Sequence, residues 1–189
     1  AHIFGAHERT VNGVKGGLFN VWAPKALSVS VVGEFNKYDG RVHLMERIED
    51  TGVFELFIPG LAAGCGYMYE IKRQGKGTTR KLDPVSRQIS SVPITASVVS
   101  DENMPDSYAW NDGLWMIKRK KEAGKKKPVT VYEVSLTDWL KEKSADELVD
   151  FVKQEGYTHV CFLPVAEYLN EEMNGYSTLG YFAVTHRTG

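Results

Sequence analysis

The chain has 189 residues, of which 42% are hydrophobic and 25% are charged, and its formal net charge is −1. This composition is typical of a soluble globular protein and gives no reason to expect nucleic acid as a partner. No apolar stretch approaches the roughly 20 residues that a membrane-spanning helix needs, so we expect no membrane partner either.

Residues 17 to about 100 are predicted to be rich in strands. Short runs of β-branched and aromatic residues alternate there with turn signals made of Gly, Pro, Asn and Asp. The expected strands are Leu18–Trp22, Ser28–Val32, Val53–Ile58, Tyr67–Lys72 and Ile94–Val99. No long helical pattern separates them, so the sequence favours a small β-sandwich. We expect Tyr67 and Tyr69 in its core and Trp22 in the core or at the rim.

Residues 101 to 128 change character and predict a connector between two domains. Asp112 is placed to cap a short helix that continues into a lysine-rich segment. No aromatic residues interleave with the lysines to stack on bases, so this segment is expected to be solvated surface. We expect Trp110 and Trp115 to pack against another part of the protein.

From Val129 onward the pattern becomes strand, helix, strand. Val129–Val134 is an expected strand, and Ser144 with Glu147 forms a capping box at the start of the following helix. The stripe expected to be buried on that helix consists of Leu148, Val149, Phe151 and Val152. Gly156 fits the left-handed position after the helix, and His159–Leu163 is apolar enough for a parallel strand buried on both faces. A closed barrel of eight such units needs roughly 250 residues, so we expect only its opening here.

The residues alone reveal no active site. Five histidines are scattered singly, and there is no glycine-rich phosphate loop, nucleophile elbow or metal-ligand spacing. The expected cofactors, metal ligands and catalytic residues are therefore none. Cys65 and Cys161 form no disulfide framework, and Cys161 is expected to be a buried thiol in a reducing cytoplasm.

A resemblance to known families covers nearly the whole chain. The stretch from Gly17 to Ala26, followed by Val29 to Asn36, resembles the family-48 carbohydrate-binding modules, which are β-sandwiches that precede the catalytic barrel of glycogen- and starch-modifying enzymes. Tyr132–Trp139, the segment from Glu147 to Glu167, and Gly180–Ala183 resemble the first barrel units of bacterial branching enzymes of glycoside hydrolase family 13.

Four residues are candidates for glucan binding, two of them implied by this resemblance and two by their place in the same turn. Tyr38 stands where the family usually has a tryptophan that stacks on glucose, and Asn36 and Asp39 in the same turn can hydrogen-bond sugar hydroxyls. Tyr176 matches a ring beside the sugar at the cleavage point, although Ser177 replaces the usual glutamine. The family's three catalytic carboxylates lie on later barrel strands, so the resemblance implies that this chain alone is inactive.

The resulting hypothesis is an all-β, immunoglobulin-like sandwich followed by an incomplete β/α segment that starts a TIM barrel. The predicted domains are the sandwich at 1–107, a connector with a short basic helix at 108–128, and the first β-α-β unit at 129–189. The expected function is that of the N-terminal fragment of a glycogen branching enzyme, with weak binding of α-glucan. The expected partners are the rest of the barrel or, for the exposed barrel segment, a second copy. Two alternatives stay open: a non-catalytic glucan-binding or interface module, and a fragment of a related debranching or trehalose-releasing hydrolase.

Overall fold

The structure is a computed structural model that describes residues 3–90, 94–101, 109–124, 127–173 and 175–188. By their contacts, residues 1–102 and 164–189 form one compact unit and residues 103–163 form a second. These units divide the chain differently from the predicted domains, whose bounds stay predictions; the expected boundary at residue 107 lies outside the described residues.

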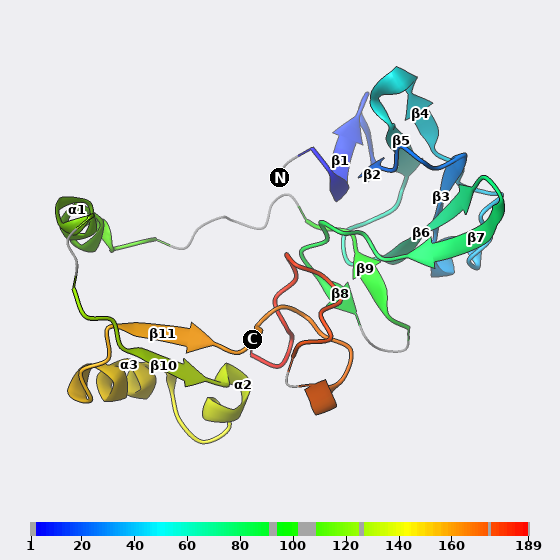
Figure 1. Ribbon diagram of the computed structural model, residues 1–189. Helices are drawn as coiled ribbons and strands as arrows, with labels where there is room; N and C mark the ends of the chain where they lie inside the picture. The colour runs from blue at the N-terminus through cyan, green and yellow to red at the C-terminus, as the bar shows by residue number, and fades with distance from the viewer. Residues whose placement is uncertain (1–2, 91–93, 102–108, 125–126, 174, 189) are drawn as a thin grey trace. The chain divides into compact units, whose positions relative to one another are not determined.

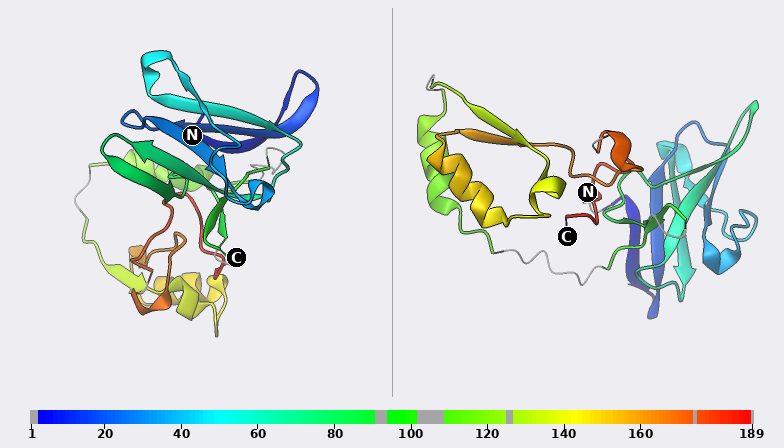
Figure 2. Two further views of the ribbon diagram at one scale, coloured as in Figure 1. Left: turned by 90° about the vertical axis from the view of Figure 1, so that its right-hand side faces the viewer. Right: turned by 90° about the horizontal axis from the view of Figure 1, so that it is seen from below.

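Two antiparallel sheets face each other in the first unit (Figures 1 and 2), which confirms the expected sandwich. One sheet has the order β1-β2-β5-β4, with bounds Gly5–Val11, Val14–Trp22, Val53–Pro59 and Glu46–Ile48. The other has the order β3-β6-β9-β8, with bounds Ser28–Val32, Gly66–Arg73, Ala96–Val98 and Ile89–Ser90, and β7 (Lys76–Lys81) pairs with β6. Short 3-10 turns follow β3 and β4 as η1 (Glu34–Asn36) and η2 (Glu49–Thr51).

Aromatic side chains from both sheets meet in the core. Phe19 of β2 contacts Tyr67 of β6 edge to face, with ring centroids 5.0 Å apart, and Tyr67 lies 5.5 Å from Tyr69 in the same way. All three rings are buried, as are Val29 and Val31. The predicted burial of Tyr67 and Tyr69 is therefore confirmed. Trp22 is 63% exposed, so of the two places expected for it, core or rim, the structure shows the rim.

A buried carboxylate joins this core to the loop after β7. The hydroxyls of Tyr67 and Tyr69 donate to Asp83 Oδ2 at 2.6 and 3.0 Å, and the Val85 amide donates to Asp83 Oδ1 at 2.9 Å. Burial raises the pKa of Asp83, although these hydrogen bonds act in the opposite direction. The network fixes the turn that carries Pro84 and Val85.

The C-terminal segment of the first unit folds around Glu167, which is 1% exposed. Its carboxylate accepts from the Tyr168 and His186 amides at 3.1 and 3.0 Å, and Arg187 Nη1 donates to it at 2.7 Å. His186 Nδ1 lies 2.8 Å from the same carboxylate. η3 (Glu171–Met173) lies within this segment. At Gly180 a Cβ would lie 2.6 Å from Ile89 Cδ1 of β8, so the segment lies against the sandwich.

The second unit contains α1 (Gly113–Glu122), β10 (Val131–Val134), α2 (Leu136–Trp139), α3 (Ala145–Gln154) and β11 (His159–Phe162). β10 and β11 are parallel, as the expected strand-helix-strand pattern requires. The capping box is confirmed: Ser144 Oγ accepts from the Glu147 amide at 3.2 Å, and Glu147 Oε2 accepts from the Ser144 amide at 2.7 Å. Gly156 has a φ of 76°, in the left-handed region expected for it.

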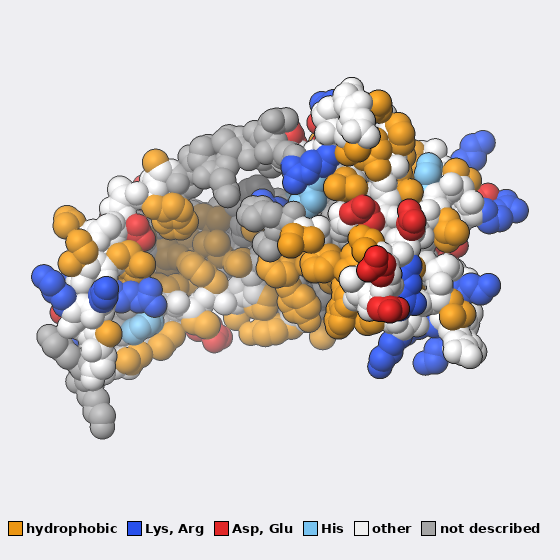
Figure 3. All heavy atoms as spheres, turned by 90° about the horizontal axis from the view of Figure 1, so that it is seen from above, with side chains coloured by type: hydrophobic (Ala, Val, Ile, Leu, Met, Phe, Trp, Pro, Cys, Tyr) orange, Lys and Arg blue, Asp and Glu red, His pale blue; other side chains and the backbone are white. Residues whose placement is uncertain are grey.

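Several burial predictions for the second unit were wrong. β11 is exposed along its length, Cys161 included, because β10 is its only strand partner among the described residues. On α3, Val149 is 48% exposed at the edge of the stripe, whereas Leu148 and Val152 are buried. Figure 3 shows that hydrophobic side chains are exposed over much of the molecular surface.

The connector helix α1 forms where it was expected, but its packing was predicted wrongly. Trp110 and Trp115 are 77% and 58% exposed, and Arg119 lies over the Trp115 ring at 5.4 Å. Asp112 occupies the position before the helix, yet its side chain makes no capping hydrogen bond. Among the described residues, no helix has the length and apolar character needed to cross a membrane.

Candidate functional site

The candidate site is the turn that leaves β3 through η1. At Gly33 a Cβ would meet the Phe35 ring and would lie 2.5 Å from the Gly66 carbonyl oxygen, so only glycine fits where the turn crosses β6. The amides of Lys37 and Tyr38 then donate to the carbonyls of Glu34 and Gly33 at 3.0 and 2.9 Å. These hydrogen bonds close a tight turn directly beside the second sheet.

Tyr38 stands in an unusual backbone conformation in this turn. Lys37 and Tyr38 have φ values of 53° and 58°, in the left-handed region that residues with a side chain rarely adopt. Such strain persists only where surrounding contacts over-determine the conformation, and it is often found at ligand sites. The backbone conformation at Lys37 and Tyr38 therefore restricts the direction in which the Tyr38 ring leaves the turn.

Arg80 of β7 contacts both the backbone and the ring of Tyr38. Its Nη2 donates to the Tyr38 carbonyl at 2.9 Å, and its guanidinium carbon lies 5.6 Å from the centroid of the Tyr38 ring. The Arg80 Nε atom is held in turn by Glu70 of β6 at 3.1 Å. Three elements thus orient one aromatic ring before any ligand binds, which reduces the entropy that binding costs.

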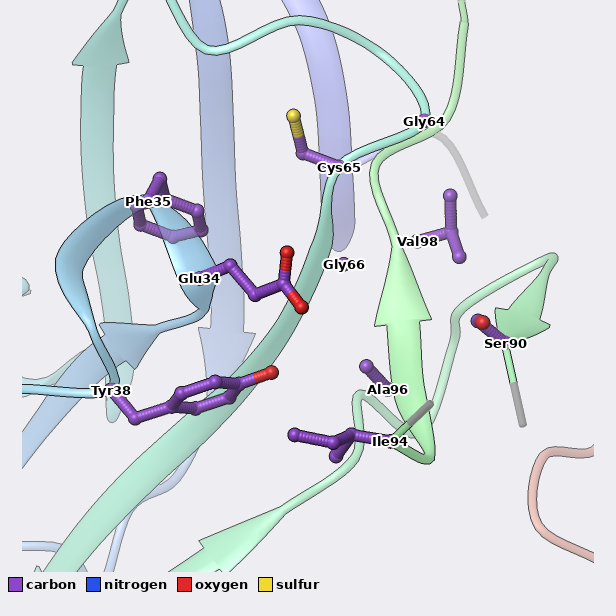
Figure 4. A pocket seen from close by; sticks show the side chains of 10 residues that line it. All are labelled: Glu34, Phe35, Tyr38, Gly64, Cys65, Gly66, Ser90, Ile94, Ala96 and Val98. Carbon is purple, nitrogen blue, oxygen red and sulfur yellow. The ribbon is translucent and has the colours of Figure 1, made fainter. Parts of the chain in front are cut away.

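A cleft of about 420 Å³ opens in front of this ring. It is lined by Glu34, Phe35, Tyr38, Gly64, Cys65, Gly66, Ser90, Ile94, Ala96 and Val98. Figure 4 shows the Tyr38 hydroxyl and the Glu34 carboxylate both pointing into it from the η1 turn, while the Cys65 sulfur points away. The cleft combines an aromatic face and apolar walls with a few polar groups, the usual composition of a small-ligand site.

The four predicted site residues have different surroundings. Tyr38 is half-buried and lines the cleft. Asn36 is only 8% exposed, and its amide is used inside the turn: Oδ1 accepts from the Gly33 amide at 3.0 Å, and Nδ2 donates to the Val31 carbonyl at 2.9 Å and lies 2.9 Å from His43 Nδ1. The geometry therefore gives Asn36 the task of holding the turn.

Asp39 and Tyr176 lie outside the described lining of the cleft. The Arg41 guanidinium and amide hold the Asp39 carboxylate, with Nη2 at 2.7 Å from Oδ2, and lower the pKa of Asp39 to about 2. Asp39 therefore carries its charge at neutral pH, paired with Arg41. Tyr176 is 64% exposed in the C-terminal segment, where its amide donates to the Met173 carbonyl at 2.9 Å.

Sequence reasoning did not find the rest of the cleft. Arg80 and the β9 residues Ala96 and Val98 are far from Tyr38 in the chain, and only the pairing of β6 with β7 and β9 brings them close. Glu34 was visible beside the turn but carried no pattern that marked it as a ligand. Among the described residues, no cluster of three or more His, Cys, Asp or Glu side chains is placed to hold a metal ion.

Comparison with known proteins matches residues 3–86 to the family of carbohydrate-binding module 48, the isoamylase N-terminal domain. The chain is 42% identical to the 1,4-alpha-glucan branching enzyme GlgB of Methylococcus capsulatus and 44% identical to that of Thiobacillus denitrificans. Each alignment covers 99% of this chain and 26% of the relative, so the chain spans about a quarter of their length.

Solved structures support the fold. The Group B Streptococcus pullulanase SAP matches 98% of this chain with a TM-score of 0.63 at 19% identity, over 29% of its own length. The pneumococcal virulence factor SpuA, described as glycogen-degrading, matches 98% with a TM-score of 0.62 at 20% identity, over 23% of its length. Residues 3–86 therefore match the carbohydrate-binding module 48 family, and the chain as a whole is highly similar to the N-terminal region of GlgB 1,4-alpha-glucan branching enzymes.

Proposed function

We propose that the sandwich binds an α-glucan chain weakly in the cleft beside Tyr38. The observation that carries this proposal is the Tyr38 ring, fixed by a left-handed backbone and by Arg80 at the mouth of a cleft. The match to a carbohydrate-binding module makes a sugar the natural ligand. The apolar C–H face of a glucose unit would stack on the ring, as aromatic faces favour.

Polar groups around the ring fit the hydroxyls of such a ligand. The Glu34 carboxylate can accept from a sugar hydroxyl inside the cleft, and the Asp39–Arg41 pair can bind others beside the turn. These groups exchange water for sugar, so each adds little net free energy. We expect a dissociation constant on the order of 0.1–1 mM, which corresponds to a binding free energy of about −4 to −5.5 kcal/mol.

We further propose that the chain is part of a cytoplasmic glycogen branching enzyme. Such an enzyme would cleave an α-1,4 chain by a retaining double displacement and transfer it to a 6-hydroxyl as an α-1,6 branch. The similarity over 99% of the chain supports this proposal. The catalytic carboxylates would belong to the other three quarters of the relatives' length, so the 189-residue chain alone should not branch amylose. Tyr176 would lie near the sugar at the cleavage point.

The second unit fits the opening of a family-13 barrel. β10 and β11 are parallel, and the apolar side chains Val131, Val160 and Phe162 on them are exposed. Strands of a complete barrel have neighbours on both edges and helices outside them. We propose that further barrel strands cover these faces in the whole enzyme, and that in the 189-residue chain the same faces favour self-association.

Replacing Tyr38 with alanine tests the glucan site. The substitution removes the stacking face but keeps the cleft open, so the affinity for maltoheptaose should fall by about tenfold, or about 1.4 kcal/mol. Isothermal titration of the wild type and the variant measures this change. The matched control is Tyr181→Ala, because Tyr181 is 83% exposed and lies outside the described lining of the cleft.

The outcomes separate the proposal from its alternatives. Equal affinities of the wild type and Tyr38→Ala would move the site elsewhere. No heat with the wild type at millimolar sugar would leave the sandwich as a spacer or interface module.

A further inference from the structure

A second cleft lies elsewhere on the sandwich, where the start of β1 and the end of β2 meet the turn after β7. Its volume is about 490 Å³, and it is lined by Phe4, Asn20, Val21, Trp22, Asp83, Pro84 and Val85. None of these residues lines the cleft beside Tyr38. A ligand in this cleft would therefore contact none of the residues that line the first site.

Asn20 is the polar group that points to a ligand. The residue is only 6% exposed and lines the cleft, yet its side-chain amide has no hydrogen-bond partner among the described residues. Among the same residues, no side-chain polar atom is fully buried without a partner, so the Asn20 amide reaches the cleft surface. Buried amides are nearly always paired, and this one can be paired by a molecule in the cleft. It offers both a donor and an acceptor.

Trp22 supplies an aromatic surface beside this amide. It is 63% exposed although it lies at the end of a core strand. Its indole Nε1 lies next to the turn at Gly52, where a Cβ would be 3.3 Å away. No described residue accepts a hydrogen bond from this nitrogen. The cleft thus has an exposed indole ring in its lining beside the Asn20 amide.

The carboxylate in the cleft lining, that of Asp83, is already used within the core. Asp83 is fully buried, and its oxygens accept from Tyr67, Tyr69 and the Val85 amide. Asp83 therefore fixes Pro84 and Val85 as an apolar wall and offers no free charge. With a neutral amide, an indole ring and apolar walls, the cleft selects an uncharged ligand that has an apolar face and hydroxyl groups. A pyranose ring has this chemistry.

We propose that the Trp22 cleft is a second saccharide site, which takes one neutral pyranose unit of an oligosaccharide. The C–H face of the sugar lies on the Trp22 indole, and its hydroxyls pair with the Asn20 amide. A chain that carries two separate weak sites holds a long glucan more tightly than either site alone, because the second contact is intramolecular.

Nuclear magnetic resonance with maltotriose tests this site in the Tyr38→Ala background, in which the first site is expected to bind about tenfold more weakly. We expect the Trp22 indole N–H signal to shift with a saturable dependence on maltotriose. The Trp115 indole N–H signal serves as the internal control, because Trp115 is also more than half exposed but lies on α1, and it should not move. Asn20→Ala should raise the maltotriose dissociation constant measured from the Trp22 signal at least about fivefold, because it removes both hydrogen bonds of the amide.

A second variant keeps the test decisive if Asn20→Ala unfolds. Trp22→Phe retains a smaller ring, so the dissociation constant for maltotriose should rise about threefold. The backbone amide signal of residue 22 reports this change, because phenylalanine has no indole N–H. A Trp22 signal that stays fixed at saturating maltotriose, or that moves together with Trp115, would overturn the second site. Loss of the Tyr38 site alone would change the wild-type titration and leave these Trp22 signals as they are.

Discussion

Asp83→Ala is expected to lower the free energy of unfolding of the sandwich by about 3 kcal/mol or more. The substitution leaves two buried tyrosine hydroxyls and the Val85 amide without their acceptor. The melting temperature should fall by at least about 12 °C for a domain of this size. Urea unfolding followed by circular dichroism measures the change. The control is Asp50→Ala in η2, an exposed carboxylate whose loss should change stability by less than about 0.5 kcal/mol.

The same carboxylate gives stability a defined dependence on pH. Burial raises the pKa of Asp83 in the folded state, so the folded state holds a proton that the unfolded state releases. Its contribution is fully present below the unfolded aspartate pKa of about 3.9 and is lost as the pH rises through the folded value. The difference in the free energy of unfolding between the wild type and Asp83→Asn should therefore shrink as the pH rises from about 3.9. An advantage that grows over this range would contradict the assigned direction.

Glu167→Ala is the second substitution with a large expected effect, and it should act locally. It removes the buried carboxylate that pairs with Arg187, whose side chain is 17% exposed. The stability of the C-terminal segment should therefore fall by about 3–5 kcal/mol. The backbone bonds of the segment, from the Leu179 amide to the Glu167 carbonyl and from the Thr185 amide to the Val165 carbonyl, should then open. Hydrogen exchange should become faster at Leu179 and Thr185, while Val29 and Val31 keep their protection.

The control for this substitution is Glu172→Ala, because Glu172 is exposed in η3. The segment should also loosen in acid. Burial raises the pKa of Glu167, but the hydrogen bonds from His186 and Tyr168 outweigh it and lower the pKa overall. This contribution is present above the unfolded glutamate pKa of about 4.3 and is lost as the pH falls through the lower folded value. Unchanged exchange at Leu179 in Glu167→Ala would show that the carboxylate does not hold the segment.

Local sequence patterns predicted the strands that build the core. β3 matches its expected bounds, and β2, β5 and β6 extend theirs by a few residues, because alternating apolar residues mark a strand with one buried face. β1, β4, β7 and β8 were missed. All side chains of β7 are exposed, and an edge strand with polar side chains on both faces leaves no periodic signal. The Ser144 capping box was predictable because both of its bonds lie within four residues.

The candidate site was predictable only in part. The turn and Tyr38 stand together in the sequence, but Arg80 reaches Tyr38 only through the pairing of β6 with β7. Asparagine is a residue type that often binds sugar hydroxyls, but the side-chain amide of Asn36 is already hydrogen-bonded to Val31, Gly33 and His43. The burial of β11 was overestimated, because an apolar strand sequence indicates burial on both faces only when other elements cover those faces. In the structure β11 is exposed along its length.

The central claim is that the cleft beside Tyr38 binds α-glucan, and mapping of backbone amide shifts with maltoheptaose tests it most directly. The largest shifts should fall on residues 34–39, 64–66 and 96–98, which surround the cleft from three elements. They should saturate with a dissociation constant on the order of 0.1–1 mM in the wild type, and in Tyr38→Ala the same shifts should need about tenfold more maltoheptaose to reach saturation. If the amide signals of these three segments do not move at saturating maltoheptaose in the wild type, the cleft beside Tyr38 does not bind α-glucan.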